Sequence, residues 1–164
     1  MISRVHYKSP IGMLCIGEEN NVITSLYLDT NVDMSSDKET DILKRAISQL
    51  KEYFNGKRSE FDLPIKLSGT DFQQKVWTAL RTIPYGETCS YKEIANRIDK
   101  PKASRAVGGA NNKNPIMILV PCHRVIGANG SMVGFGAGIE AKEYLLNLER
   151  EYKMSLNITN GSKK

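Results

Sequence analysis

Alternating hydrophobic and polar positions near the N-terminus predict three short strands. The β-rich runs are "SRVHY" (3–7), "GMLCIG" (12–17) and "NVITSLYL" (21–28), and turn-forming residues separate them at 9–10 and 19–21. A helical pattern follows within residues 35–57, with a capping serine and acidic residues at its start and Asn55-Gly56 at its end. Its apolar stripe consists of Ile42, Leu43, Ala46, Ile47, Leu50, Tyr53 and Phe54. The sequence therefore predicts an α/β domain over residues 1–62, with a small antiparallel sheet and one packed helix.

The second half of the chain is predicted to be mostly helical. Residues 63–70 are interpreted as a linker. An amphipathic helix begins at Asp71 and ends at the proline and glycine of "IPYGE" (83–87). A short helix from Ser90 to about Ile98 follows, and after a polar turn Pro101 suits the first turn of another helix. This spacing is typical of a helix-turn-helix.

The remaining elements surround a cysteine. The apolar run "IMILV" (116–120) predicts a strand that delivers Pro121-Cys122, and "GANGSMVGFGAG" (127–138) predicts a glycine-rich hairpin and loop. A last helix is expected over 139–152, with Ala141, Leu145, Leu148 and Tyr152 on one face. Residues 71–152 are therefore predicted to form a second domain, and residues 153–164 a disordered tail.

The second helix of the helix-turn-helix is unusual because its side chains are small. A helix that reads the major groove needs several long polar side chains, but "ASRAVGGA" (103–110) offers one long cation, Arg105. Two glycines inside a helix cost about 1 kcal/mol each relative to alanine. Small residues allow close backbone approach, which suits the minor groove of a duplex with one inserted arginine, or alternatively tight packing on another helix.

Positive charge is concentrated in the same region. Between Tyr91 and Arg124 lie seven basic and two acidic residues, a net +5 that equals the net charge of the whole chain. A basic stretch on an otherwise neutral chain indicates a polyanionic partner, although a solvated surface would carry the same pattern.

Composition narrows the class of protein. The N-terminus lacks the basic and long apolar segments of a signal peptide, and no run approaches the ~20 apolar residues of a membrane span, which predicts an intracellular, cytoplasmic protein. Three cysteines without framework spacing indicate free thiols. His6 and Cys15 are interpreted as structural strand residues, and no metal or other cofactor is predicted.

Cys122 is the candidate nucleophile. It stands between Pro121 and His123-Arg124, where nearby cations would favour the reactive thiolate. Neighbouring side chains of an extended segment point to opposite faces, so the imidazole of His123 needs a bend at Pro121 or a bridging water to reach the sulfur. Glu149 on the last helix is the candidate carboxylate that orients this imidazole. A buried, inert cysteine is the alternative interpretation.

These residues carry a specific resemblance. "PCHRVIG" (121–127) after "NPIMILV" (114–120), with "SYKEIA" (90–95) and "RAVGGANNKNP" (105–115) upstream, resembles the O6-alkylguanine-DNA alkyltransferases, which repair DNA by direct reversal. The likeness is strong over residues 71–149 and weaker for "SPIGMLCIG" (9–17) in the N-terminal domain. It implies a ribonuclease-H-like N-terminal domain, a winged-helix-like C-terminal domain and irreversible, single-turnover transfer of an alkyl group from O6-alkylguanine in double-stranded DNA. O4-methylthymine remains open as a second substrate, and the protein is expected to be a monomer.

The resemblance also implies individual roles. Cys122, His123 and Glu149 match the nucleophile, the base that acts through water and the orienting acid. Tyr91 matches a tyrosine that drives rotation of the damaged base and donates to its ring, and Asn114 matches a hinge before the cysteine segment. Arg105 matches the arginine that fills the vacated stack. Further DNA contacts are expected at Lys92, Ala103, Ser104, Gly108 and Gly109, and the substrate pocket at Met117, Val125, Gly134, Phe135 and Ala137.

Two departures from the family pattern affect these expectations. The loop "GFGAG" (134–138) lacks the tyrosine and serine that some relatives place near the alkylated oxygen, so backbone N–H groups are expected to serve there. Glu18 and Glu19 lie where some relatives hold a structural zinc. An alkyltransferase-like sensor without catalysis, a helix-turn-helix regulator and a cysteine hydrolase remain as alternatives; Cys122 argues against the first, and the small-residue helix against the second.

Overall fold

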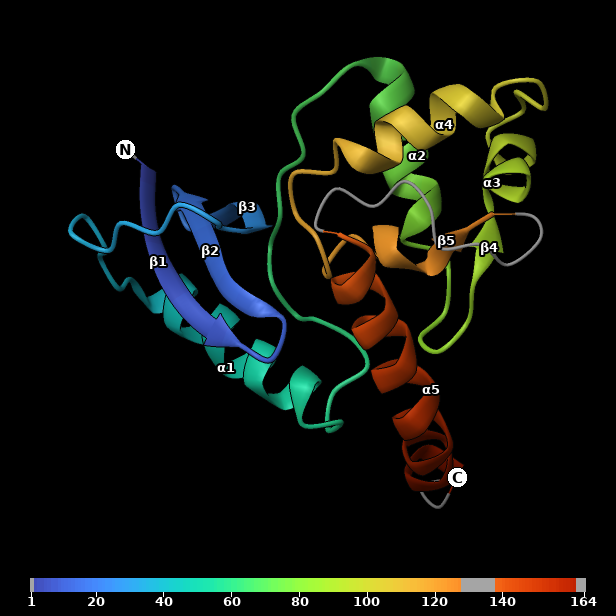
Figure 1. Cartoon of the computed structure of the whole chain (residues 1–164). Helices are drawn as coiled ribbons and strands as arrows, with labels where there is room; N and C mark the ends of the chain where they lie inside the picture. Colours follow the sequence, from blue (N-terminus) through green and yellow to red (C-terminus); the bar gives the residue numbers. More distant parts are fainter. Residues whose placement is uncertain (1, 128–137, 162–164) are drawn as a thin grey trace.

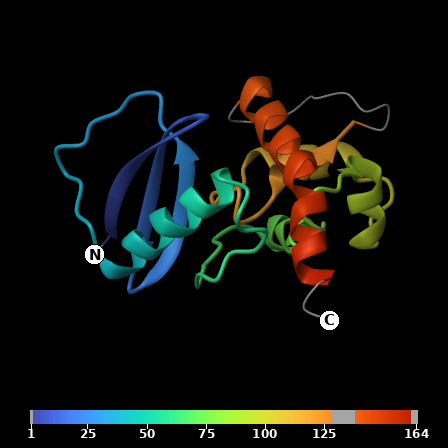
Figure 2. The same cartoon turned by 90° about the horizontal axis from the view of Figure 1, so that it is seen from below.

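The structure, a computed structural model, describes residues 2–127 and 138–161. An N-terminal α/β lobe and a mostly helical C-terminal lobe lie side by side in two views (Figure 1, Figure 2). The elements of the first lobe are β1 (Ile2–Ser9), β2 (Gly12–Glu19), β3 (Val22–Leu28) and α1 (Asp41–Phe54). Those of the second are α2 (Asp71–Leu80), β4 (Cys89–Ser90), α3 (Tyr91–Arg97), α4 (Ser104–Asn112), the 3₁₀ turn η1 (Cys122–Arg124), β5 (Val125–Ile126) and α5 (Ile139–Gly161).

The N-terminal lobe confirms the predicted antiparallel sheet with one packed helix. The strands pair in the order β1-β2-β3, and α1 buries its apolar stripe against them. The predicted serine cap is wrong: Thr40 caps the helix, and its hydroxyl accepts a hydrogen bond from the backbone N–H of Leu43 at 3.4 Å. Threonine can take this position because its side-chain oxygen reaches the same free N–H groups that serine would satisfy.

The C-terminal lobe confirms the predicted helix-turn-helix. Capping boxes begin two of its helices, with Thr70 and Gln73 at α2 and Ser90 and Glu93 at α3. Each box satisfies two N–H groups that have no partner within the helix, which fixes where the helix begins. Pro101 does not lie in the first turn of α4, as predicted, but in the connecting turn.

The segment that precedes Cys122 differs from the predicted strand. Only isolated bridges form in residues 116–120, and Ile118 adopts a φ of 72°, a left-handed conformation that a β-branched residue rarely takes. The reason is tertiary: Leu26 on β3 pairs with Ile116, and the chain must then turn sharply to bring Cys122 back toward the helices. Residues 116–120, which lead to Cys122, are thereby attached to β3 at the edge of the N-terminal sheet.

Helix α5 extends beyond its predicted end. Its backbone is helical from Ile139 to Gly161, so the structure does not support a disordered segment directly after residue 152. The predicted apolar face is confirmed, with Ala141, Leu145 and Leu148 buried and Tyr152 partly buried against the core. One hydrophobic core runs through both lobes. None of the described helices is long and apolar enough to cross a membrane.

Candidate active site and nucleic-acid interface

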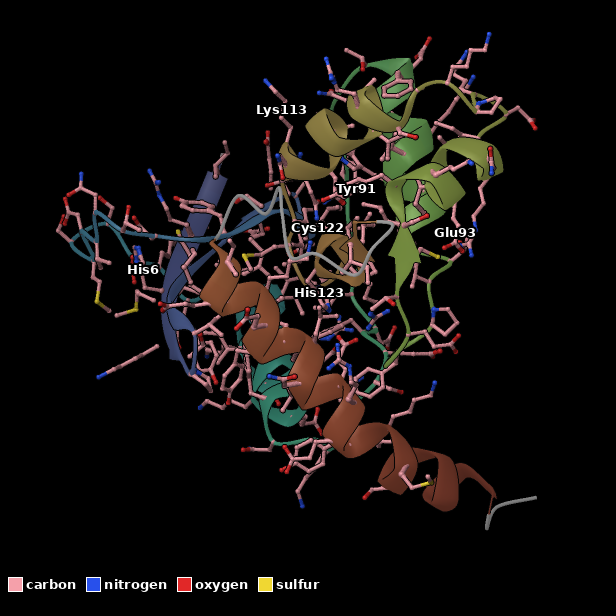
Figure 3. All side chains as sticks on the ribbon, turned by 45° about the vertical axis from the view of Figure 1, so that its right-hand side comes forward. His6, Tyr91, Glu93, Lys113, Cys122 and His123 are labelled. Carbon is pink, nitrogen blue, oxygen red and sulfur yellow. The ribbon has the colours of Figure 1, made fainter. Side chains whose placement is uncertain are left out.

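Cys122 lies buried at the start of η1, a turn that packs against α5 and α2 (Figure 3). Its backbone N–H donates to the carbonyl of Val120 at 2.8 Å, and that of Arg124 donates to Pro121 at 3.0 Å. This tight turn replaces the extended geometry that would point Cys122 and His123 to opposite faces. The chain therefore bends at Pro121, one of the two predicted alternatives, but Nδ1 of His123 makes no hydrogen bond to the sulfur.

The thiol of Cys122 is neutral in the resting protein. Burial raises its pKa to about 11, although a hydrogen bond from Asn114 and the charge of Lys142 act in the opposite direction. The sequence predicts that nearby cations and hydrogen-bond donors favour the thiolate; Lys142 and Asn114 act in this way, whereas the guanidinium of Arg124 binds Glu149 instead. Reaction of this sulfur requires a base that removes its proton.

His123 is held in a defined orientation next to Cys122 in the sequence. Its Nε2 lies 2.6 Å from Oε2 of Glu149, and a carboxylate only accepts, so Nε2 carries the hydrogen and Nδ1 presents a lone pair. Nδ1 is buried and has no hydrogen-bonding partner among the described residues. Burial lowers the pKa of His123 against the opposing effect of Glu149, which keeps the imidazole neutral.

Glu149 is the centre of a buried network that joins both lobes. Arg124 donates to Oε1 at 2.8 Å and to Oε2 at 3.1 Å, and the hydroxyl of Tyr53 on α1 donates to Oε2 at 2.6 Å. The backbone N–H of Gly86 donates to Oε1 at 3.2 Å. Burial opposes ionisation of this carboxyl, but His123 and Arg124 hold its pKa well below the usual range. The carboxylate therefore remains charged at any pH near neutrality.

Tyr91 and Asn114 reach the same site from opposite ends of the helix-turn-helix. Parallel pairing of β4 with β5 places the start of α3, and with it Tyr91, beside the residues that follow Cys122. Burial and the neighbouring Cys122 raise the pKa of Tyr91, so its hydroxyl keeps its proton. Asn114 donates to the carbonyl of Val120 at 2.7 Å and accepts from the N–H of Ile116 at 3.0 Å, which closes the loop between α4 and Cys122.

Sequence reasoning missed three contributors to this site. Lys142 is fully buried on α5, donates to the carbonyl of Val125 and has a pKa lowered by burial. Its position could have been found, because it lies seven residues before Glu149 and so on the same helix face. Tyr53 resembled an ordinary core residue, and buried Asn111, which donates to the carbonyl of Cys122 at 3.3 Å, resembled a turn residue.

The predicted DNA-contacting residues of the helix-turn-helix are all exposed or partly exposed. Lys92 and Arg105 are exposed, and Ala103 and Ser104 are partly exposed at the start of α4. A side chain at Gly109 would meet no other atom within 4 Å, so this part of α4 is open to close approach. At Gly108 a Cβ would lie 3.7 Å from the ring of Tyr91, an ordinary van der Waals contact, so internal packing does not require glycine there.

Six of the seven basic residues in the segment 91–124 are exposed, and Arg124 is buried. The exposed positive charge is therefore Lys92, Arg97, Lys100, Lys102, Arg105 and Lys113. Such a group, distributed over two helices and their turn, can contact phosphates at several points.

The predicted pocket wall is described only in part. Val125 and Met117 are buried, with the backbone N–H of Met117 bonded to the carbonyl of Leu26 at 3.0 Å. Gly134, Phe135 and Ala137 lie outside the described residues. Potential metal ligands gather in the described chain at His6, Cys15 and Asp29, a group that includes neither Cys122 nor His123.

Comparisons with known proteins agree with this geometry. Residues 71–151 match the family model described as "6-O-methylguanine DNA methyltransferase, DNA binding domain", and residues 3–67 match its "ribonuclease-like domain". The methylated-DNA–protein-cysteine methyltransferase of Mycobacterium bovis is 50% identical over 153 residues, 89% of this chain and 93% of that protein. The constitutive enzyme of that name in Bacillus subtilis is 49% identical over 152 residues, 87% of this chain and 92% of that protein.

Solved structures give the same result. A crystal structure of the Mycobacterium tuberculosis O6-methylguanine methyltransferase has a TM-score of 0.85 and 47% identity, covering 93% of this chain and 94% of that one. The Mycobacterium tuberculosis OGT in complex with DNA has a TM-score of 0.84 and 48% identity, covering 92% of this chain and 94% of that one. This chain belongs to the 6-O-methylguanine DNA methyltransferase family.

Proposed function

We propose that this chain repairs double-stranded DNA by transferring the alkyl group of O6-alkylguanine to Sγ of Cys122, once per protein molecule. The observation that carries the proposal is the pairing of a buried thiol with an oriented, neutral imidazole next to a helix-turn-helix. The curated relatives named methylated-DNA–protein-cysteine methyltransferases support this reaction class.

The proton of Cys122 passes to Nδ1 of His123 through a water. Because Nε2 is bonded to Glu149, Nδ1 is the free basic atom of the ring, and the negative carboxylate stabilises the imidazolium that forms. Lys142 and Asn114 then stabilise the thiolate, since both already act on the sulfur in that direction. The thiolate of Cys122 therefore forms only when Nδ1 of His123 accepts the proton.

The transfer is a displacement at a saturated carbon. The sulfur lone pair forms a bond to the alkyl carbon, the bond from that carbon to O6 breaks, and guanine leaves with the electron pair. Guanine then receives a proton from the hydroxyl of Tyr91, which burial keeps protonated, and the proton taken from Cys122 finally restores Tyr91. The product is a thioether, whose carbon–sulfur bond water in this site does not hydrolyse, so the protein acts once.

Helix α4 provides the surface that binds the DNA next to Cys122. Its small, open surface at Gly109 suits close approach to the minor groove, and exposed Arg105 enters the stack that the flipped base leaves. Flipping costs a few kcal/mol, and less for a damaged pair, which favours the lesion over normal guanine. A monomer suffices for this arrangement, because every residue assigned here comes from one chain.

Mass spectrometry of the intact protein tests the proposal. After incubation with duplex containing O6-methylguanine, we expect one added methylene, about 14 Da by formula, located on Cys122. Cys15 and Cys89 are buried free cysteines in the same chain and serve as internal controls. A repaired duplex with an unmodified Cys122, or more than one lesion repaired per molecule, would contradict the proposal and favour a hydrolase. Binding without repair would favour a non-catalytic sensor.

Arg105→Ala separates base flipping from chemistry. We expect repair of duplex to slow by about 10- to 100-fold because the vacated stack is no longer filled, whereas reaction with free O6-methylguanine base stays unchanged. Lys102→Ala is the matched control, since it removes one exposed positive charge from the adjacent turn and should only weaken binding in a salt-dependent manner. Equal losses of Arg105→Ala on duplex and free base would exclude the insertion role.

A further inference from the structure

A second group of reactive side chains crosses the N-terminal sheet, away from Cys122 (Figure 3). The strand register places His6 opposite Cys15 and Cys15 opposite Tyr27, so the three residues form a row across the sheet. Strand alternation turns this row away from the face that carries Leu14 and Ile16 of the core. The proposed DNA repair reaction uses none of these residues.

The loop between β3 and α1 covers the row with two carboxylates. Asp37 accepts the backbone N–H of His6 at 2.9 Å, and its other oxygen lies 2.8 Å from Nδ1 of the same residue. Asp29 approaches from the opposite side, with Oδ2 2.8 Å from Nε2 of His6. One ligand atom each from His6, Cys15 and Asp29 lie within 4.8 Å of one another.

The contact between Nε2 of His6 and Asp29 needs a positive species, either a proton on Nε2 or a metal ion. Because Asp37 only accepts, Nδ1 carries a hydrogen, and the neutral ring then presents the lone pair of Nε2 directly to a carboxylate oxygen. Two acceptors at 2.8 Å repel unless a proton or a metal ion lies between them. A proton on Nε2 satisfies this pair, and against the opposing effect of burial Asp29 and Asp37 raise the pKa of His6, so a metal ion would have to displace that proton. The register that sets Cys15 opposite His6 brings a third ligand atom within reach of such an ion.

The surrounding charges suit a divalent ion. Asp29, Asp37 and a metal-bound Cys15 thiolate would supply three negative charges, Asp33 lies close enough to interact electrostatically with His6 and Arg4, and Arg4 supplies one positive charge. A divalent ion therefore offsets the excess negative charge around His6, in keeping with the high cost of unpaired buried charge. The side chain of Asp29 is 16% exposed, so water can complete the coordination from the solvent side.

We propose that Nε2 of His6, Sγ of Cys15 and a carboxylate oxygen of Asp29 bind a zinc ion, with Asp37 orienting the imidazole. A mixed nitrogen, sulfur and oxygen set is typical of zinc, and a carboxylate that holds the other ring nitrogen is the common support for a metal-bound histidine. The ion links β1, β2 and the covering loop. The proposed ligands do not include Glu18 or Glu19, which lie in the region where some relatives hold a structural zinc.

Cobalt substitution tests the thiolate ligand directly. The double variant Cys89→Ala, Cys122→Ala leaves Cys15 as the sole cysteine of the chain. Titrated with cobalt(II), it is expected to bind one equivalent with the intense near-ultraviolet absorption of a cobalt–thiolate bond, and zinc should displace the cobalt. If the double variant does not fold, the comparison of Cys15→Ser with the unmodified chain replaces it, and one equivalent of bound zinc should be lost. Absence of a saturable cobalt–thiolate band in the folded double variant, or unchanged zinc stoichiometry in Cys15→Ser, overturns the proposal.

Asp37→Asn tests the support of the imidazole. In the same double variant we expect zinc affinity to fall about 10- to 100-fold, the usual effect of removing such a partner. Glu39→Gln is the matched control, because it removes one negative charge from an exposed residue of the same loop and should leave zinc affinity unchanged. Equal effects of the two substitutions, or no effect of either, would reduce the cluster to a histidine–carboxylate salt bridge. X-ray absorption of the zinc-loaded protein should report one sulfur ligand.

Discussion

Cys122→Ser is expected to abolish alkyl transfer while binding of the damaged duplex persists. Serine is nearly isosteric with cysteine, and Cys122 is only 5% exposed, so the substitution leaves the open surface of α4 intact. The hydroxyl is a far weaker acid than the thiol, and His123 cannot convert it into an equally reactive anion. Binding is measured by fluorescence anisotropy of labelled duplex, and transfer by recovery of unmodified guanine.

Cys89→Ser is the matched control for this result. Cys89 is a second buried cysteine of the C-terminal lobe, on β4 beside the start of α3, and burial raises its pKa as well. We expect transfer by this variant at the rate of the unmodified chain. Continued demethylation by Cys122→Ser would show that another group accepts the alkyl carbon.

Glu149→Gln is expected to reduce both stability and reactivity. The carboxylate binds His123, Arg124 and Tyr53, and its side chain is 1% exposed. Removing its charge leaves Arg124 buried without a counter-ion, which typically costs about 3–5 kcal/mol and here lowers Tm by on the order of 10 °C. Loss of the negative charge beside His123 also destabilises the imidazolium, which should slow transfer by about 10²- to 10⁴-fold.

The contribution of Glu149 to the stability of the fold depends on pH and decreases in acid. The pKa of Glu149 is lower in the folded than in the unfolded chain, so its contribution is fully present above the unfolded value of about 4.3 and is lost as pH falls toward the folded value. The difference in Tm between the two proteins should therefore shrink in acid. Glu143→Gln, an exposed position on the same helix, is the control and should change neither Tm nor rate. An unchanged rate in Glu149→Gln would remove this carboxylate from the mechanism.

Local patterns predicted the elements that local interactions determine. Thr70 and Ser90 precede helices because their side chains cap nearby N–H groups, and the last helix keeps its apolar face because that face packs against the core. The pattern "PCHRVIG" identified Cys122 and His123, since their chemistry depends on adjacent residues. These features needed no knowledge of the rest of the fold.

Contacts between distant residues could not be predicted in this way. Residues 116–120 have the composition of a strand, but pairing with Leu26 and the turn at Ile118 override that preference. Tyr53 and Glu149 are 96 residues apart in sequence, and no local pattern indicates that the hydroxyl of one bonds the other. Arg124 illustrates the same limit: its position beside Cys122 suggested activation of the thiol, but its partners lie on α5 and at the carbonyl of Ile83.

The burial of Cys122 protects the thiol from reactions other than alkyl transfer. With a pKa of about 11, roughly one sulfur in ten thousand is ionised at neutral pH, and the side chain offers little surface to solvent. Dissolved oxidants and small electrophiles attack the ionised form, so they consume the acceptor slowly. Under the proposed reaction, in which each molecule acts once, this protection preserves Cys122 until a damaged base is bound.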